Sequence, residues 1–286
     1  MEQSLFDAQS VQKLEQEFQN LTLSLNNKTL STPSDFALTL KNVSSSHNIK
    51  SLGVVMDGNR RWAKQNDLSQ YDGYKAGLKK FIELVSWCLQ ANIPHLTVYA
   101  FSNENWERKE AEYLQKKHVE STVQLFTNLF NMVKSFFIKN KVQIKIIGEI
   151  QRFEPLLQDL ITQIQNITNI DDSSQTSKIT VWICASYGGK LEIVDGVNKM
   201  MRHFSSLPYF DKVKLETFEQ CLWSADCPDL DLIIRTSGEK RLSGFMTWKS
   251  TYAELFFVDE LWPDFTQEKF TDILNDYSKR DRRMGK

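Results

Sequence analysis

The sequence predicts an α/β fold with an open, mostly parallel six-stranded sheet flanked by helices. From residue 51 onward, six short apolar runs alternate with longer segments whose apolar residues recur at helical spacing. Alternation of strands and helices is typical of parallel sheets with covering helices. The chain has 286 residues, 41% of them hydrophobic, which is enough for one large core. We therefore expect one main domain at residues 51–286.

The first 50 residues are expected to form an N-terminal extension. Five apolar side chains step by three and four along it, which predicts one helical stripe: Val11, Leu14, Phe18, Leu21 and Leu25. The opposite face is acidic, so packing on the main domain or on a second copy is favoured over membrane binding. Residues 26–46 are rich in Ser, Thr and Asn, which indicates a linker.

The expected strands are residues 52–56, 95–101, 142–147, 179–185, 230–234 and 254–258. A long segment at 112–140 carries apolar side chains on more than one helical stripe. It is either a helix buried on two sides or a helix with one face lining an apolar cavity. Ligands of open α/β sheets collect at the carboxyl ends of the strands. The residues after each strand are therefore the first candidates for a site.

Asp57-Gly58-Asn59 follows the first strand and opens a helix with Arg60 and Arg61. Free amides at a helix start and two guanidinium groups favour a phosphate anion, and glycine permits a close backbone approach. Asp57 is suited to a hard cation such as Mg²⁺, which itself binds phosphates. The alternative is an ordinary helix cap with surface arginines.

A second cluster, RTSGEKRLS at 235–243, follows the fifth strand and again combines glycine, hydroxyls and cations. It is either a second anion site or a solvated loop. Glu254 lies in an otherwise apolar strand, where an unpaired carboxylate would cost several kcal/mol. It needs either an arginine partner or a metal ion.

Composition excludes several classes of protein. A net charge of -1 provides no bulk attraction to nucleic acid. We find no signal sequence and no apolar stretch near the roughly 20 residues of a membrane span. The four cysteines lack paired spacing, which favours a reducing compartment, so we expect a cytoplasmic protein, soluble or peripheral to a membrane. P-loop, GxGxxG, DDxxD and zinc patterns are missing.

Taken together, the motifs resemble the cis-prenyltransferase family, which includes undecaprenyl and dehydrodolichyl diphosphate synthases. They occur in family order: MDGNRRWA, YAFSNENWER, IKIIGE, SYGG, DLIIRTSGEKRLSGFMTWKSTYAELFF, LWPDF and RDRRMG. The resemblance covers about residues 52–286. It implies a Mg²⁺-dependent enzyme that adds isopentenyl diphosphate repeatedly to an allylic diphosphate, usually farnesyl diphosphate, with each new double bond cis. It also implies an apolar tunnel for the product, a homodimer, and transient association with a membrane surface through the product.

The resemblance assigns roles by position. Asp57 and Asn105 are implied to act at the reacting ends, and Asp57 and Glu254 at the metal. A magnesium diphosphate between Asp57 and the arginines would mean that these groups need not pair. The allylic diphosphate is implied to contact Gly58, Asn59, Arg60, Arg61, Trp62, Gln70, Tyr74, Ser102, Trp106 and Arg108. Ser102, Asn105, Trp106 and Arg108 match a mobile loop of the family. Isopentenyl diphosphate is implied to contact Arg235, Arg241, Ser243 and, from a partner's tail, Arg283 and Gly285.

Four positions depart from the family pattern. Gln70 and Tyr74 stand where Arg and His are common, and Trp182 and Ser186 stand where Asn is common. Reaction class is therefore better determined than substrate. We expect a long-chain polyprenyl diphosphate synthase. The alternatives are a short-chain or irregular synthase and a non-catalytic activating subunit, although the latter typically lacks the aspartate present here as Asp57.

Overall fold

The computed structural model describes residues 49–107, 119–169, 178–204 and 212–281, with isolated positions 16, 20, 23 and 24. The predicted stripe at 11–25 lies largely outside the described residues, and the linker at 26–46 lies wholly outside them. Every further statement about the structure concerns the described residues.

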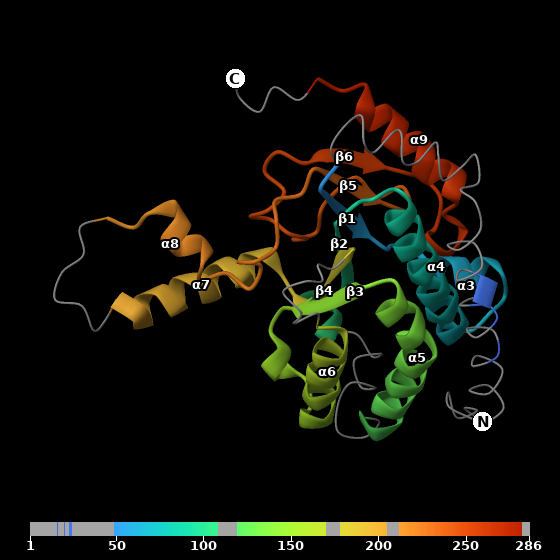
Figure 1. Ribbon diagram of the computed structural model, residues 1–286, viewed down its shortest axis with the longest axis horizontal. Coiled ribbons are helices and arrows are strands. Elements are labelled where there is room, and N and C mark those ends of the chain that lie inside the picture. Colours follow the sequence, from blue (N-terminus) through green and yellow to red (C-terminus); the bar gives the residue numbers. More distant parts are fainter. Residues whose placement is uncertain are drawn as a thin grey trace.

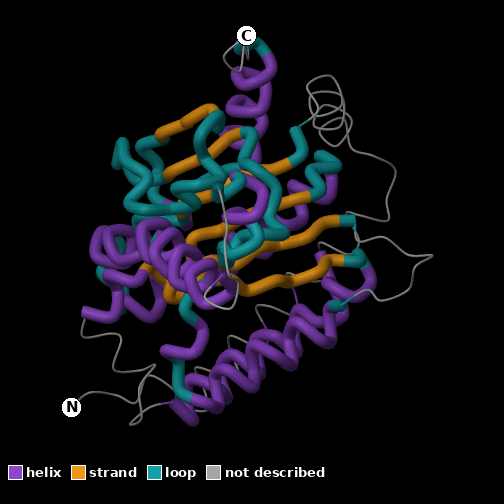
Figure 2. The backbone as a smooth tube through the Cα atoms, turned by 90° about the vertical axis from the view of Figure 1, so that its left-hand side faces the viewer, coloured by secondary structure: helices purple, strands orange, loops and turns teal. Residues whose placement is uncertain are grey.

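Six strands form one sheet in which every neighbouring pair is parallel, in the order β3-β4-β2-β1-β5-β6. The predicted fold class is thereby confirmed, and Figure 2 shows the strands as successive rungs of a single layer. The strand bounds are β1 Ser51–Val55, β2 His95–Ser102, β3 Val142–Ile147, β4 Ile179–Tyr187, β5 Leu232–Arg235 and β6 Glu254–Phe257. The fifth strand begins two residues later than predicted, because Leu230 N donates to Lys249 O in the turns before β6 and not to a neighbouring strand.

Helices connect the first five strands in the alternating pattern typical of a parallel sheet, whereas β5 and β6 are joined by turns alone. Local signals explain several of their starts: Ser69 accepts a hydrogen bond from Asp72 N at the start of α4, and Pro155 occupies the first turn of α6. The helix bounds are α3 Asn59–Gln65, α4 Gln70–Gln90, α5 Val119–Lys139, α6 Pro155–Thr168, α7 Gly189–Phe204, α8 Leu215–Glu219 and α9 Gln267–Ser278, with short 3-10 turns η1 Asn103–Glu107, η3 Ile150–Arg152 and η4 Trp262–Asp264.

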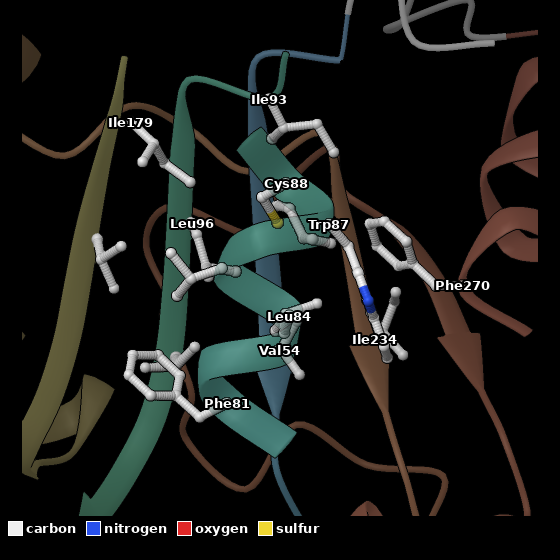
Figure 3. Close-up of a cluster of buried hydrophobic side chains, with 14 of the residues drawn as sticks. Val54, Phe81, Leu84, Trp87, Cys88, Ile93, Leu96, Ile179, Ile234 and Phe270 are labelled. Atoms are coloured by element: carbon white, nitrogen blue, oxygen red, sulfur yellow. The ribbon is translucent and has the colours of Figure 1, made fainter. Parts of the chain in front are cut away.

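One face of the sheet packs against α4, α5 and α9. The main core joins strand residues such as Val54 and Leu96 with Leu84 of α4, Phe136 of α5 and Phe270 of α9. Figure 3 shows α4 side chains directed at the strands in this core. The described part of α5 contributes buried side chains to it, which agrees with a packed helix.

The opposite face is covered mainly by the turns of residues 220–250, which supply a second core around Phe245 and Met246. Helices α7 and α8 extend away from the body of the molecule (Figure 1). None of the helices in the described residues is long and apolar enough to cross a membrane.

Candidate functional site

The site lies where β1 and β5 end side by side. Val55 is level with Arg235 in the parallel ladder, so the turn after β1 and the loop after β5 leave the sheet together. Asp57 N donates to Thr236 Oγ1 at 3.0 Å, and that hydroxyl donates to Asp57 O at 2.6 Å. These bonds fix the Asp57 backbone on the neighbouring loop. The sequence marked Thr236 only as part of the second cluster and gave no sign of this role.

Gly58 shapes the turn that begins α3. Its φ of 112° lies in the region that favours glycine, and an added Cβ would be 2.9 Å from Leu261 Cδ2. Asn59 then starts α3, as predicted. The Asn59 Oδ1 atom is buried, with no hydrogen-bond partner within the described parts of the chain. Asn59 Nδ2 donates to Met56 O at 3.5 Å, so the Asn59 amide is held against the turn around Asp57.

Asp57 pairs directly with two guanidinium groups. Arg235 Nη2 lies 2.9 Å from Asp57 Oδ2, and Arg61 Nη2 lies 3.5 Å from Asp57 Oδ1. Asp57 and the two arginines thus pair in the chain by itself, and their separation by a magnesium diphosphate stays a prediction. The parallel register accounts for the Arg235 pair, because it brings this buried guanidinium beside the turn that carries Asp57.

The pairing changes the acidity of Asp57. Burial acts to raise its pKa, but the hydrogen bond and charge of Arg235, with the charge of Arg61, outweigh burial and lower the pKa below its ordinary value. Asp57 is therefore ionised at neutral pH. About a third of its side chain remains exposed, so the carboxylate is open to a ligand.

The Arg235 guanidinium is held by the second cluster. Its Nη1 donates to Arg241 O at 2.5 Å and to Ser243 Oγ at 2.9 Å, while its buried Nε has no partner in the described chain. Ser237 and Ser243 have φ of 78° and 51°, unusual for residues with side chains. The structure thus brings the side chains of Arg235 and Ser243 together. Arg241 contacts Arg235 through its backbone oxygen and not through its guanidinium.

The Arg241 side chain is exposed and pairs with Glu239. Glu239 also lies 3.5 Å from Arg61, and Arg61 donates to Ser237 Oγ at 2.6 Å. A single carboxylate therefore faces both arginines that were expected to bind different diphosphates. Sequence reasoning singled out neither Glu239 nor Ser237, because no local pattern links the second cluster to Arg61, which is 176 residues away from Ser237.

The segment after β2 lies at the same edge of the sheet. Ser102 N donates to Asn105 Oδ1 at 3.0 Å, and Trp106 Nε1 donates to Ser186 Oγ at 2.9 Å. The Arg152 guanidinium lies 4.9 Å from the centre of the Trp106 ring, a contact that the sequence did not predict. Ser186 thus joins the site by binding Trp106. Arg108 lies outside the described residues.

The remaining predicted allylic contacts lie on α3 and α4. Trp62 Nε1 donates to Asp264 Oδ1 at 2.7 Å. Arg60 is exposed in the first turn of α3. Gln70 is the first residue of α4 and is exposed, and Tyr74 lies one turn later with 42% of its surface exposed. These four side chains are accessible from solvent or partly so.

Glu254 lies at the other end of the sheet. Glu254 is the first residue of β6 and pairs in register with Leu232 of β5. Leu232 pairs in register with Leu52 of β1, and Leu52 precedes Asp57 by five residues. At about 3.3 Å per residue, this places the two acids roughly 16 Å apart along the strands. Glu254 pairs with Arg280 at 2.6 Å. The structure therefore supplies the arginine partner and does not bring Glu254 to Asp57 within one chain.

Arg283 and Gly285 lie outside the described residues. Helix α9 ends at Ser278, and Arg280 then contacts Glu254 at the amino end of β6. The described part of the chain therefore ends near that strand end, away from the Asp57 turn.

The donor set at Asp57 fits a magnesium diphosphate better than an all-protein metal centre. Among the described residues, no three His, Cys, Asp or Glu side chains gather as a metal site. Mg²⁺ is commonly held by one or two carboxylates together with substrate phosphates. One ionised carboxylate beside two arginines meets that requirement.

Several known proteins are similar to this chain in sequence or in fold. Residues 55–285 match the Prenyltransf family model, described as putative undecaprenyl diphosphate synthase. An isoprenyl transferase of Thermotoga maritima is 37% identical over 236 residues, covering 82% of this chain and 95% of that protein. A ditrans,polycis-undecaprenyl-diphosphate synthase of Wigglesworthia glossinidia brevipalpis, specific for (2E,6E)-farnesyl diphosphate, is 35% identical, covering 82% and 86%. The crystal structure of lavandulyl diphosphate synthase from Lavandula x intermedia, with dimethylallyl diphosphate, matches with a TM-score of 0.72 and 26% identity, covering 86% of this chain and 100% of that one.

Proposed function

Because the chain belongs to the undecaprenyl diphosphate synthase family of cis-prenyltransferases, we propose that it condenses isopentenyl diphosphate onto farnesyl diphosphate to make a long-chain polyprenyl diphosphate. One observation carries the proposal beyond family membership. Arg61 and Arg235 each lie within 3.5 Å of the Asp57 carboxylate, at adjoining strand ends. An acid and two cations at that point suit a metal-bound diphosphate and its leaving charge.

The chemistry follows from these groups. Cleavage of the allylic carbon–oxygen bond spreads negative charge onto the diphosphate, and preorganised cations stabilise that charge. Asp57 would hold Mg²⁺ with diphosphate oxygens, and the ion supplies further positive charge there. Arg61 and Asn59 serve the allylic diphosphate, while Arg235, Arg241 and Ser243 serve isopentenyl diphosphate. The unpartnered Nε of Arg235 provides a donor in the buried wall of the second site, within the part of the chain that the structure describes.

The η1 segment would close over the reacting ends. Ser102, Asn105 and Trp106 already lie at the site edge through the two bonds described above. Arg108 follows directly in the chain and is assigned to the same loop. The tunnel for the growing product is assigned to the apolar face of α5, of which Phe126 is 43% exposed.

A homodimer is supported by an apolar stripe on the protruding α7. Val194, Val197 and Met201 recur at helical spacing and are 56%, 38% and 63% exposed, and Leu215 of α8 is 60% exposed. Replacing Val194 and Met201 together with Glu should convert the dimer to a monomer in light scattering. Gln163→Glu, on the exposed side of α6, is the matched control. A wild-type monomer at micromolar concentration would refute the dimer.

The dimer would also account for the displaced residues. Glu254 lies at the end of the sheet opposite the Asp57 turn, and Arg280, which contacts it, precedes Arg283 and Gly285 by three and five residues in the sequence. Glu254, Arg283 and Gly285 would then join the site of a second copy. Their roles in metal and isopentenyl diphosphate binding are therefore proposed to act between subunits.

The test is an assay of the purified chain alone with Mg²⁺, farnesyl diphosphate and labelled isopentenyl diphosphate, followed by product sizing. Long products would support the proposal, and they would associate with membrane surfaces through their apolar chains. Short products from dimethylallyl diphosphate would instead support a short-chain or irregular synthase, a candidate favoured by the likeness to lavandulyl diphosphate synthase. No product with any allylic substrate would indicate an activating subunit.

A further inference from the structure

The segment after β6 contacts both anion-binding loops. Ser237 N donates to Glu260 O at 2.7 Å, and Gly238 N donates to Val258 O at 2.8 Å. Further along the same segment, Trp262 N donates to Asp57 O at 3.0 Å. We call residues 258–264 the brace. The loop after Arg235 and the turn that carries Asp57 are thus both hydrogen-bonded to the brace, although these two residues are 178 positions apart in sequence.

The Trp262 side chain extends the brace into the core. It is fully buried, its ring centroid lies 5.9 Å from that of Phe265, and its indole Nε1 donates to Gly77 O on α4 at 2.8 Å. One residue therefore bonds the Asp57 turn through its main chain and α4 through its side chain. The position of the ring sets the spacing between these two elements.

Gly77 links the indole to Asn59. A Cβ at Gly77 would lie 2.2 Å from Asn59 Oδ1 and 3.1 Å from Trp262 Cδ1. The Asn59 amide and the Trp262 indole therefore both pack directly against Gly77. Asn59 Oδ1 has no hydrogen-bond partner in the described structure, and Asn59 Nδ2 donates to Met56 O at 3.5 Å, so this bond and packing on Gly77 together determine where the amide lies.

We propose that Trp262 is a positioning residue for the allylic diphosphate site. It holds the Asp57 carbonyl through its own N–H and the Asn59 amide through Gly77. The inference rests on the proposed function for the identity of the ligand. Its physical basis is that hydrogen bonds to a bound diphosphate weaken steeply as distance and angle depart from their optimum, so a small shift of the binding groups lowers affinity.

The test compares Trp262→Phe with Trp87→Phe. Trp87 is also buried, its ring lies 6.2 Å from that of Phe265, and it points into the core beside Phe270 (Figure 3). Both variants remove an indole from the same core and should lower the thermal midpoint. Only Trp262→Phe should raise the KM for farnesyl diphosphate, by roughly tenfold, with a smaller change in kcat. Equal KM values in the two variants would overturn the proposal.

Gly77→Ala tests the same link while retaining every core ring. The added methyl group displaces the Asn59 amide, so the KM for farnesyl diphosphate should again rise while the KM for isopentenyl diphosphate stays constant. Gly196→Ala, in α7, is the control, since its Cβ would meet only movable side chains, with Leu222 nearest at 3.0 Å. An unchanged allylic KM in Gly77→Ala would contradict the role assigned to Trp262, even if Trp262→Phe fails to fold.

Failure of the proposed function would look different. A folded wild-type chain without synthase activity would refute the function. The affinities of Trp262→Phe and Trp87→Phe for inorganic pyrophosphate with Mg²⁺, measured by calorimetry, would still decide the role of Trp262. Weaker binding in Trp262→Phe alone supports positioning, and equal binding overturns it.

Discussion

Replacing Asp57 by Ala should separate metal-assisted turnover from diphosphate binding. In the chain by itself the carboxylate holds Arg235 at 2.9 Å and Arg61 at 3.5 Å. The substitution therefore removes the proposed metal ligand and at the same time releases two cations. We expect turnover to fall at least about a hundredfold, which corresponds to roughly 2.7 kcal/mol of lost transition-state stabilisation.

Binding of metal-free diphosphate should change in the opposite direction. A diphosphate that approaches Arg235 must compete with the Asp57 carboxylate and is repelled by its charge. A hydrogen bond to a charged group contributes about 1.5–3 kcal/mol, and solvent around the partly exposed carboxylate reduces this to about 1 kcal/mol. Asp57→Ala should therefore bind inorganic pyrophosphate about fivefold more tightly without metal.

The assay combines steady-state kinetics in Mg²⁺ with calorimetry of pyrophosphate binding in EDTA. Asp72→Ala is a matched control, because Asp72 pairs with Lys75 at 3.4 Å, on α4 and away from the second cluster. Circular dichroism checks the fold of both variants. If pyrophosphate binding in EDTA weakens as much as turnover falls, Asp57 maintains the site's structure and the competition argument is wrong.

Three further predictions test other parts of the site and fold. Gln70→Arg should partly rescue allylic binding in Arg60→Gly, since either arginine would supply a charge-assisted contact worth roughly tenfold or more; strictly additive affinities in a double-mutant cycle would show that the two positions do not share the diphosphate. Burial, with the charge of Lys145, lowers the pKa of His95 below 6.5. Below that pH the unfolded chain therefore binds more protons than the folded chain. In urea unfolding, the free energy of unfolding of the wild type should fall relative to that of His95→Gln as pH falls below about 6.5. Parallel curves of this free energy against pH would contradict the prediction. Deleting residues 282–286 should raise the KM for isopentenyl diphosphate without unfolding the chain, and mixing with Asp57→Ala should restore part of the activity; an undiminished truncated enzyme would remove the tail from the site.

The sequence by itself determined the parts of the fold that depend on local pattern. Buried parallel strands are short apolar runs, so all six could be recognised from residue type and spacing. The Asp57 turn and the Arg235 cluster were located in the same way, because glycine and polar residues directly follow those runs.

Only the tertiary structure decided which of these residues meet. The β1–β5 register brought the Arg235 side chain beside the Asp57 carboxylate. The β5–β6 register placed Glu254 level with Leu232, at the opposite end of the sheet from that aspartate. The hydrogen bonds of Trp262 to Asp57 O and to Gly77 O likewise join parts of the chain that are far apart in the sequence. Hydrophobic periodicity is set within a few residues and determines which side chains of a strand are buried, whereas the order of the strands, and with it the residues that meet, depends on packing between elements far apart in the sequence.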